Sequence, residues 1–219
     1  MSKGTAFIIG AGPGLGRALA HAFSTEGHPV ALFARDADRA ERYAAELRRA
    51  GYRARGFRAD AADAEGLSAA LELAAGDLGA PEVMVYNAVM TQTDTPTEAD
   101  ATAWGRSLAV NVTGAAVAAR TVLPLLRGER RSLLFTGGAL ALQPSPQYAT
   151  LSVGKAALRA YVQALHADLA ETGVLAATVT IAGSIGGPDP RFAPQTLAGV
   201  YLDLHHRPSE QWQAELVYT

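Results

Sequence analysis

Short apolar runs alternate with amphipathic stretches along the whole chain. The apolar runs predict strands at 6–10, 30–34, 54–58, 83–87, 132–136 and 176–182, with a last edge strand at 215–218. The stretches with helical spacing predict helices at 14–26, 36–50, 64–75, 97–126 and 151–172, and a short one near 197–205. Strands buried on both faces are apolar throughout, so this alternation predicts a parallel sheet covered by helices on both sides.

Right-handed crossovers between such strands would build a doubly wound, Rossmann-type α/β fold with three layers. We predict a single dinucleotide-binding domain over residues 1–219, because no linker or internal repeat divides the chain. Ligands bind such sheets beyond the carboxyl ends of the strands. The residues that follow each strand are therefore the candidates for a functional site.

The first predicted strand runs into a glycine-rich turn that opens a helix. Gly10, Gly14 and Gly16 form the pattern G-x-x-x-G-x-G, with Leu15 where G-x-G-x-x-G would have its third glycine. Glycines let a backbone approach a phosphate closely, and the first N–H groups of a helix favour negative charge. We expect Gly10, Gly14, Leu15 and Gly16 to bind the phosphates of a dinucleotide.

The residues that follow the second, third and fourth predicted strands indicate which dinucleotide binds. Ala34 stands where an acid would contact a ribose 2′-hydroxyl, and Arg35 follows at once, which suits the 2′-phosphate of NADP(H). Asp36 is expected to cap the next helix. After the third strand, Asp60 can accept from the adenine amino group or can turn the loop. After the fourth, Asn87 is expected to fix the backbone beside the cofactor.

Composition excludes several other functions. The formal net charge is −2, which gives no electrostatic reason to bind nucleic acid or anionic lipid. No cysteine occurs, so disulfides and thiol catalysis are excluded, and the histidines lack the spacing of metal ligands. No apolar run reaches membrane-spanning length, and the first strand begins too early to leave room for a signal peptide. We expect a soluble, cytoplasmic protein with a small-molecule substrate.

Together these motifs resemble those of the short-chain dehydrogenase/reductase family, over nearly the whole chain. The glycine turn matches the family's first turn, with Ile9 in place of its threonine, and the segment 86–89 keeps half of its N-N-A-G motif. Asn111 matches the asparagine of its fourth helix, and Gly183 matches the glycine after its sixth strand. The resemblance implies that Asn111 holds a water of a proton relay and that Gly183 leaves room for the nicotinamide. It also implies a homodimer or homotetramer formed through the fourth and fifth helices.

The family's catalytic signature is only partly present. Members carry Y-x-x-x-K on the fifth helix, with a serine thirteen residues before the tyrosine. Lys155 matches the lysine, but Leu151 stands at the tyrosine position and Gly138 at the serine position. Neither can supply a proton. Tyr148, one helical turn before Leu151, is the candidate acid if the helix begins early enough, although it can also serve only to staple the helix entrance. Thr136 and a water held by the relay asparagine are the fallbacks.

Lys155 indicates that the pocket still binds a ligand. Of 19 basic residues only Lys3 and Lys155 are lysines, and an ammonium can contact ribose hydroxyls where a guanidinium would not fit. The hypothesis that we favour is an NADP(H)-dependent oxidoreductase with a rebuilt acid site, acting on a small carbonyl, alcohol or enone. Two alternatives stay open: an NADP(H)-binding pseudoenzyme or partner subunit, and an isomerase or dehydratase on the same fold.

Overall fold

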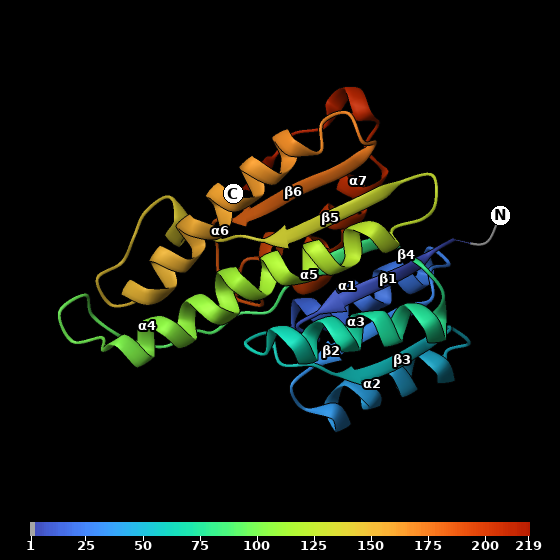
Figure 1. The fold of residues 1–219 in the computed structure, drawn as a ribbon, viewed down its shortest axis with the longest axis horizontal. Helices are drawn as coiled ribbons and strands as arrows, with labels where there is room; N and C mark the ends of the chain where they lie inside the picture. Colours follow the sequence, from blue (N-terminus) through green and yellow to red (C-terminus); the bar gives the residue numbers. More distant parts are fainter. Residues whose placement is uncertain (1–2) are drawn as a thin grey trace.

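Seven parallel strands form the centre of the computed structural model, which describes residues 3–219 (Figure 1). They are β1 (Thr5–Ile9), β2 (Val30–Ala34), β3 (Ala54–Arg58), β4 (Pro81–Tyr86), β5 (Arg131–Thr136), β6 (Val174–Ile181) and β7 (Glu215–Tyr218). Their order across the sheet is β3-β2-β1-β4-β5-β6-β7, and every neighbouring pair is parallel. All the predicted strands are confirmed to within two residues at each end.

Helices cover both faces of this sheet, which makes the predicted three-layer Rossmann-type domain. They are α1 (Leu15–Thr25), α2 (Ala37–Arg49), α3 (Ala64–Leu78), α4 (Ala101–Leu108), α5 (Gly114–Val122), α6 (Ala149–Asp168) and α7 (Pro194–His206). One core cluster joins α3, α5 and α6 to one face, which lies in front in Figure 1. A second cluster joins α1, α2 and α7 to the opposite face. The apolar residues of each strand thus alternate between two cores.

The predicted helix 97–126 is present, but its start and its regularity differ from the prediction. It begins at Ala101, because the side chain of Asp100 accepts a hydrogen bond from Ala103 N (2.7 Å) and so caps the helix there. A π-helical turn, Ala109–Thr113, separates α4 from α5, and a short 3₁₀ turn, Leu123–Leu125, ends the run. Such a turn inserts one residue into the helical ladder and leaves the apolar pattern almost unchanged, so it could not be predicted from that pattern.

The same run, Ala101–Leu125, is long and apolar enough to cross a membrane by length and composition. Our expectation that nothing in the chain reaches that length was therefore wrong. In the structure the run belongs to the domain, since α5 packs on the sheet and beside α3. However, only 39% of its most apolar window is buried. Length and composition alone do not separate a helix of a packed domain from a membrane span.

The strand order reverses between β1 and β4, and this reversal places the site. The chain leaves β1 towards β2 and β3 on one side and returns through α3 to β4 on the other. The carboxyl ends of β1 and β4 therefore part at the same edge of the sheet and leave a crevice between them, where ligands of doubly wound folds bind.

Candidate functional site

A cavity of about 1250 Å³ opens at the carboxyl edge of the sheet. Every predicted site residue except Asn111 lines it: Gly10, Gly14, Leu15, Gly16, Arg35, Asp60, Asn87, Tyr148, Lys155 and Gly183. The fold thus gathers residues from both ends of the sequence around one space. The size is sufficient for a dinucleotide and a small second molecule, since drug-sized ligands occupy pockets of roughly 300–1,000 Å³.

The glycine turn leaves the N-terminus of α1 bare. Gly10 has a φ of 91°, which side chains rarely adopt, and a Cβ on Gly16 would lie 2.4 Å from Gly10 O. Those two glycines are needed for the turn itself. A Cβ on Gly12 or Gly14 would meet nothing within 4 Å, and both residues line the cavity. No side chain caps α1 at Gly14. Uncapped N–H groups facing an open space fit the pyrophosphate of a dinucleotide.

The end of the cavity beyond β2 carries the charged residues expected to bind the adenosine half. Arg35 is exposed and lines the cavity. Asp36 accepts from Arg39 N (3.1 Å), so it caps α2 as expected. Asp60 lines the cavity, while its Oδ1 accepts from Ala62 N (3.0 Å) and turns the loop. Arg39 also lines the cavity. Arg39 was not predicted from the sequence, because Arg35 precedes the N-cap Asp36 and no helical spacing joins the two arginines.

Asn87 connects the glycine turn to the end of β5. Its Nδ2 donates to Gly10 O (2.9 Å), and its Oδ1 accepts from Thr136 Oγ1 (3.0 Å). The Thr136 hydroxyl also hydrogen-bonds to Tyr201 OH (2.8 Å), which reaches it from α7. The side chain of Asn87 therefore fixes backbone at the crevice. Tyr201 could not have been found from the sequence, because no spacing rule joins it to Thr136.

Asn111 lies within the π-helical turn, is 1% exposed and does not line the cavity. Its Oδ1 accepts from Met90 N and its Nδ2 donates to Met90 O, both at 3.1 Å. Nδ2 also donates to Ser107 Oγ (3.1 Å). Both ends of the amide thus hold the segment that follows β4, and the water-holding role implied by the resemblance stays a prediction.

Gly183 lies on the cavity wall after β6, and a neighbouring aromatic ring explains why it is a glycine. A Cβ at this position would fall 2.3 Å from the ring of Phe192. Any side chain here would displace that ring, which is buried in the core cluster that contains α1, α2 and α7. The packing of Phe192 is therefore sufficient to require a glycine, whether or not a nicotinamide lies against it.

The positions of the expected tyrosine and serine face the cavity without a hydroxyl group. Leu151 and Gly138 both line it, and Leu151 is 7% exposed. Lys155 lies beside them, with its Nζ donating to Thr136 O (2.7 Å). Burial lowers the pKa of Lys155 from its ordinary value to about 8. The cavity wall thus holds a buried amine whose pKa is lowered because burial disfavours its charged form.

Tyr148 also lines the cavity, but not for the reason that the sequence suggested. It is the N-cap of α6, with φ −140° and ψ 51°, outside the helical region. The helix does not begin early enough to include Tyr148, so the condition under which it would share a helical face with Leu151 is not met. Its carbonyl accepts from Ser152 Oγ (2.7 Å), which buries that hydroxyl away from the cavity. Asp94 fixes the early start of α6 by accepting from Thr150 N (3.1 Å).

A parallel sheet with a bare helix N-terminus at its switch point defines a Rossmann-type dinucleotide-binding protein. The family model described as short chain dehydrogenase matches residues 4–185. The chain therefore belongs to the short-chain dehydrogenase/reductase family, as its motifs indicated.

Two curated relatives and two solved structures illustrate the similarity. 2-(S)-Hydroxypropyl-CoM dehydrogenase 3 of Xanthobacter autotrophicus is 35% identical over 168 residues, which cover 76% of this chain and 66% of that protein. D-Threitol dehydrogenase of Mycolicibacterium smegmatis is 28% identical over 202 residues, covering 92% and 72%. A dehydrogenase/reductase from Sinorhizobium meliloti has a TM-score of 0.88 at 27% identity, covering 99% and 94%. A metagenomic short-chain oxidoreductase in complex with NADP has a TM-score of 0.87 at 20% identity, covering 99% and 96%. This chain spans 66% of the length of the Xanthobacter relative. It spans 62% of the length of a further relative, a short chain dehydrogenase of Pseudocercospora fijiensis.

Proposed function

We propose that the protein is an NADP(H)-dependent oxidoreductase that interconverts a small carbonyl compound, or an enone, with its reduced form. The observation that carries this is the combination, in one cavity, of a bare helix N-terminus, an exposed arginine beyond β2 and the buried amine of Lys155. The names of the relatives, two of them dehydrogenases, support a redox reaction. The NADP complex of a solved family member supports the choice of cofactor.

Different residues of the cavity would bind different parts of the cofactor. The turn 10–16 would hold the pyrophosphate on the N-terminus of α1, and Arg35 would bind the 2′-phosphate, with Asp60 on the adenine side. Asn87 and Gly183 line the part of the cavity next to Lys155, where the nicotinamide half belongs. When bound, the nicotinamide supplies or accepts the hydride, while this chain orients the reacting groups and handles the proton.

Apolar side chains make up much of the rest of the cavity wall. Val89, Met90, Leu140, Leu151 and Ile185 line the cavity, together with the hydroxyl-bearing Thr91 and Ser184. Such walls favour a substrate that is apolar around its reacting group, and they exclude the water that would compete for a proton. We therefore propose apolar aldehydes, ketones or enones as substrates, rather than acids or phosphorylated compounds.

The test is the consumption of NADPH, followed by absorbance, against a panel of apolar aldehydes, ketones, quinones and enones. Anionic carbonyl compounds of the same size serve as matched controls. We expect turnover with the apolar set only. Binding of NADPH without turnover across the panel would contradict the oxidoreductase.

Leu151 and Gly138 support a second candidate, an NADP(H)-binding module without redox turnover. Neither residue has a hydroxyl, and one relative, 30% identical over 172 residues, is named an inactive dehydrogenase. The double variant Leu151→Tyr with Gly138→Ser distinguishes the two candidates. A serine Cβ at position 138 would have Lys155 Cε, at 4.0 Å, as its nearest neighbour, so it fits. Carbonyl reduction that appears only in the double variant would favour the binding module.

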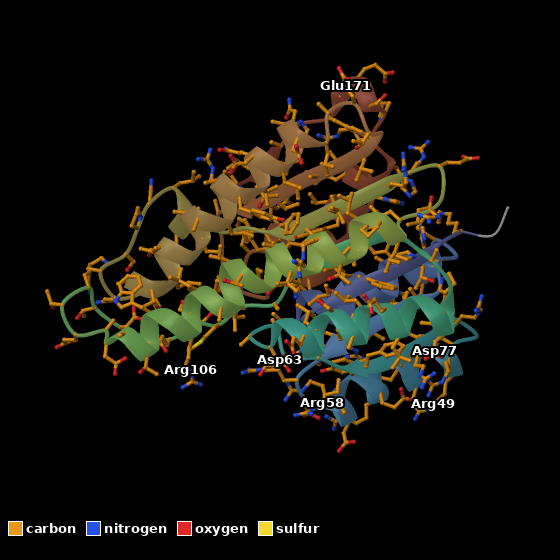
Figure 2. The ribbon with its side chains drawn as sticks, viewed as in Figure 1. Arg49, Arg58, Asp63, Asp77, Arg106 and Glu171 are labelled. Atoms are coloured by element: carbon orange, nitrogen blue, oxygen red, sulfur yellow. The ribbon has the colours of Figure 1, made fainter. Side chains whose placement is uncertain are left out.

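We also propose a homodimer or homotetramer that forms through the α4–α5 run and α6. Only 39% of the most apolar window of that run is buried, and Val153 of α6 is 46% exposed. Figure 2 shows Arg106 projecting from α4 at the edge of the molecule. Apolar helix faces of this size are usually covered. A cytoplasmic location is our proposal from composition alone.

A further inference from the structure

We propose that Lys155 itself donates the proton to the carbonyl oxygen, in place of the missing tyrosine. The proposal rests on the proposed function, because it assigns the acid of that same reaction. Three observations support it: the space beside the amine, the free N–H groups of the amine, and the competing hydrogen bonds that occupy two other hydroxyls.

The space beside Lys155 is open on the side of the β5–α6 loop. A Cβ built on Gly138 would have Lys155 Cε as its nearest neighbour, at 4.0 Å. Leu151 lies one helical turn before Lys155 on α6 and presents only methyl groups. No hydroxyl from either position therefore stands between the cavity and Nζ. Since Lys155 lines the cavity, neither of these two positions would place a hydroxyl between a bound carbonyl and the amine.

The ammonium group of Lys155 has more N–H donors than hydrogen-bond partners in the described residues. Its Nζ makes one hydrogen bond to the protein within residues 3–219, to Thr136 O at 2.7 Å. An ammonium carries three N–H groups. Two of them are consequently free for a ligand, and the bond to Thr136 O holds Nζ at the wall of the cavity that Lys155 lines.

Two other hydroxyls near this end are already engaged. Thr136 Oγ1 donates to Asn87 Oδ1 (3.0 Å), so its proton points away from a substrate. Ser152 Oγ donates to the carbonyl of Tyr148 (2.7 Å). Tyr148, Thr91 and Ser184 also line the cavity and carry hydroxyl groups, so they are the rival donors among the described residues.

The protonation state of Lys155 suits this role. Burial brings the pKa of its ammonium to about 8, close to neutral solution. General acids work best when their pKa lies near the operating pH, and an ordinary lysine would hold its proton too strongly. Titratable groups on the neighbouring elements are Tyr148 at the start of α6 and Tyr201 of α7, whose hydroxyl bonds Thr136. Burial raises the pKa of Tyr201, so its hydroxyl stays neutral.

In the proposed step, hydride transfer to carbon and proton transfer to oxygen together reduce the carbonyl group to an alcohol. The carbonyl carbon accepts a hydride from reduced nicotinamide, and the π electron pair of the C=O bond moves onto oxygen. The oxygen takes a proton from Lys155 Nζ, so the products are the alcohol, oxidised nicotinamide and a neutral amine. The amine then takes up a proton from solvent. In the reverse direction, the neutral amine accepts the hydroxyl proton as a general base.

The first experiment measures the amine without using activity. Protein made with lysine labelled with ¹³C at Cε gives signals from only two side chains, because Lys3 and Lys155 are the only lysines. A Lys3→Arg variant assigns the signals. We expect the Lys155 signal to titrate with a midpoint near the value of about 8 set by burial. A midpoint above about pH 10, as for an ordinary lysine, would overturn the assignment whatever the activity.

The second experiment compares that midpoint with turnover. The kcat for carbonyl reduction should fall as pH rises through the Lys155 midpoint, and the kcat for alcohol oxidation should rise through it. Lys155→Met should lower kcat by roughly 10²–10⁴-fold and remove this pH limb. Lys3→Met is the matched control. Lys155→Arg keeps the positive charge but cannot release a proton, so it should stay as slow as Lys155→Met.

Each failure points to a different cause. If Tyr148→Phe removes the pH limb and Lys155→Met keeps it, Tyr148 is the acid and our assignment is wrong. If Lys155→Arg restores turnover, the lysine acts by charge alone and is not the donor. If the unaltered protein binds NADPH but reduces nothing in the panel, the proposed function fails, and the acid role fails with it.

Discussion

Two alanine substitutions in the glycine turn should separate folding from cofactor binding. In Gly16→Ala, the new methyl group would lie 2.4 Å from Gly10 O and 3.0 Å from Ala11 Cα. Both are backbone atoms, so neither can swing aside. In Gly12→Ala, the methyl group would meet nothing within 4 Å, but it would enter the cavity that Gly12 lines. The first change should therefore damage the fold, and the second only the site.

The magnitudes follow from these contacts. Overpacking costs about 1–3 kcal/mol, and for a chain of this size each kcal/mol lowers Tm by roughly 2–4 °C. Gly16→Ala should thus lose about 2–12 °C without cofactor. Gly12→Ala should keep its Tm or gain slightly, because alanine restricts the unfolded chain. NADPH at about a hundred times its Kd adds about 2.7 kcal/mol, a rise of roughly 5–11 °C. Gly12→Ala should lose most of this rise, since the methyl group stands where phosphate must approach.

The assay is thermal unfolding of the three proteins, followed by circular dichroism with and without NADPH. Circular dichroism before heating checks that both variants are folded. Gly16→Ala unfolding at the temperature of the unaltered protein would show that the turn is looser than the structure has it. A full NADPH rise in Gly12→Ala would refute the assignment of the phosphate site to this turn.

Three further predictions concern charge, acid stability and assembly. Arg35→Ala should raise the Kd for NADPH by roughly ten- to hundred-fold, because a guanidinium–phosphate contact is worth about 1.5–3 kcal/mol. The Kd for NADH should hardly change. Intrinsic fluorescence measures both constants, and an equal loss of affinity for both cofactors would contradict the role of Arg35. Burial lowers the pKa of His205 to about 3 and also lowers that of His28. In the unfolded chain both histidines take up protons near pH 6.5, whereas in the folded protein they stay neutral. The free energy of unfolding should therefore be highest above about pH 6.5 and fall as the pH drops below it, by up to about 1.4 kcal/mol per pH unit for each histidine. Urea unfolding should show this slope between about pH 6.5 and 5, above the range where carboxylates titrate, and His205→Asn should reduce it; an unchanged slope would exclude His205 as its source. Light scattering should give at least twice the chain mass of 22.8 kDa, and a mass near 22.8 kDa at micromolar concentration would argue against the dimer.

The fold was predictable because its determinants are local. A strand buried on both faces shows as a short apolar run, and the turn 10–16 shows as glycines, whatever the rest of the chain does. Asp36 as the cap of α2 is equally a matter of neighbouring residues. The helix starts at Ala101 and Ala149 were missed for different reasons. Asp100 caps the first locally, and its signal was overlooked. Asp94 supports the second from a segment far away in sequence.

The site was predictable as a set of positions, but not as a set of contacts. Strand ends meet at one edge by topology, so residues such as Asn87 and Lys155 had to converge. The side-chain partners depend on packing across the sheet. Nothing in the sequence joins Tyr201 of α7 to Thr136, or assigns the ring of Phe192 to Gly183. The same limit hid the non-helical backbone of Tyr148.

The two substitutions that remove the usual acid also change the surroundings of the lysine. Leu151 and Gly138 offer the amine no hydroxyl, so within residues 3–219 its one hydrogen-bond partner is Thr136 O, and burial lowers the pKa of Lys155 to about 8. Restoring hydroxyls should reverse this. In Leu151→Tyr with Gly138→Ser, we expect the ¹³Cε signal of Lys155 to titrate at higher pH, because hydrogen-bonding groups stabilise the ammonium. The rebuilt site would then have a conventional acid and a less acidic lysine. An unchanged Lys155 midpoint in a folded double variant would show that the low pKa comes from the sheet and α6 alone, and not from the loss of these two hydroxyls.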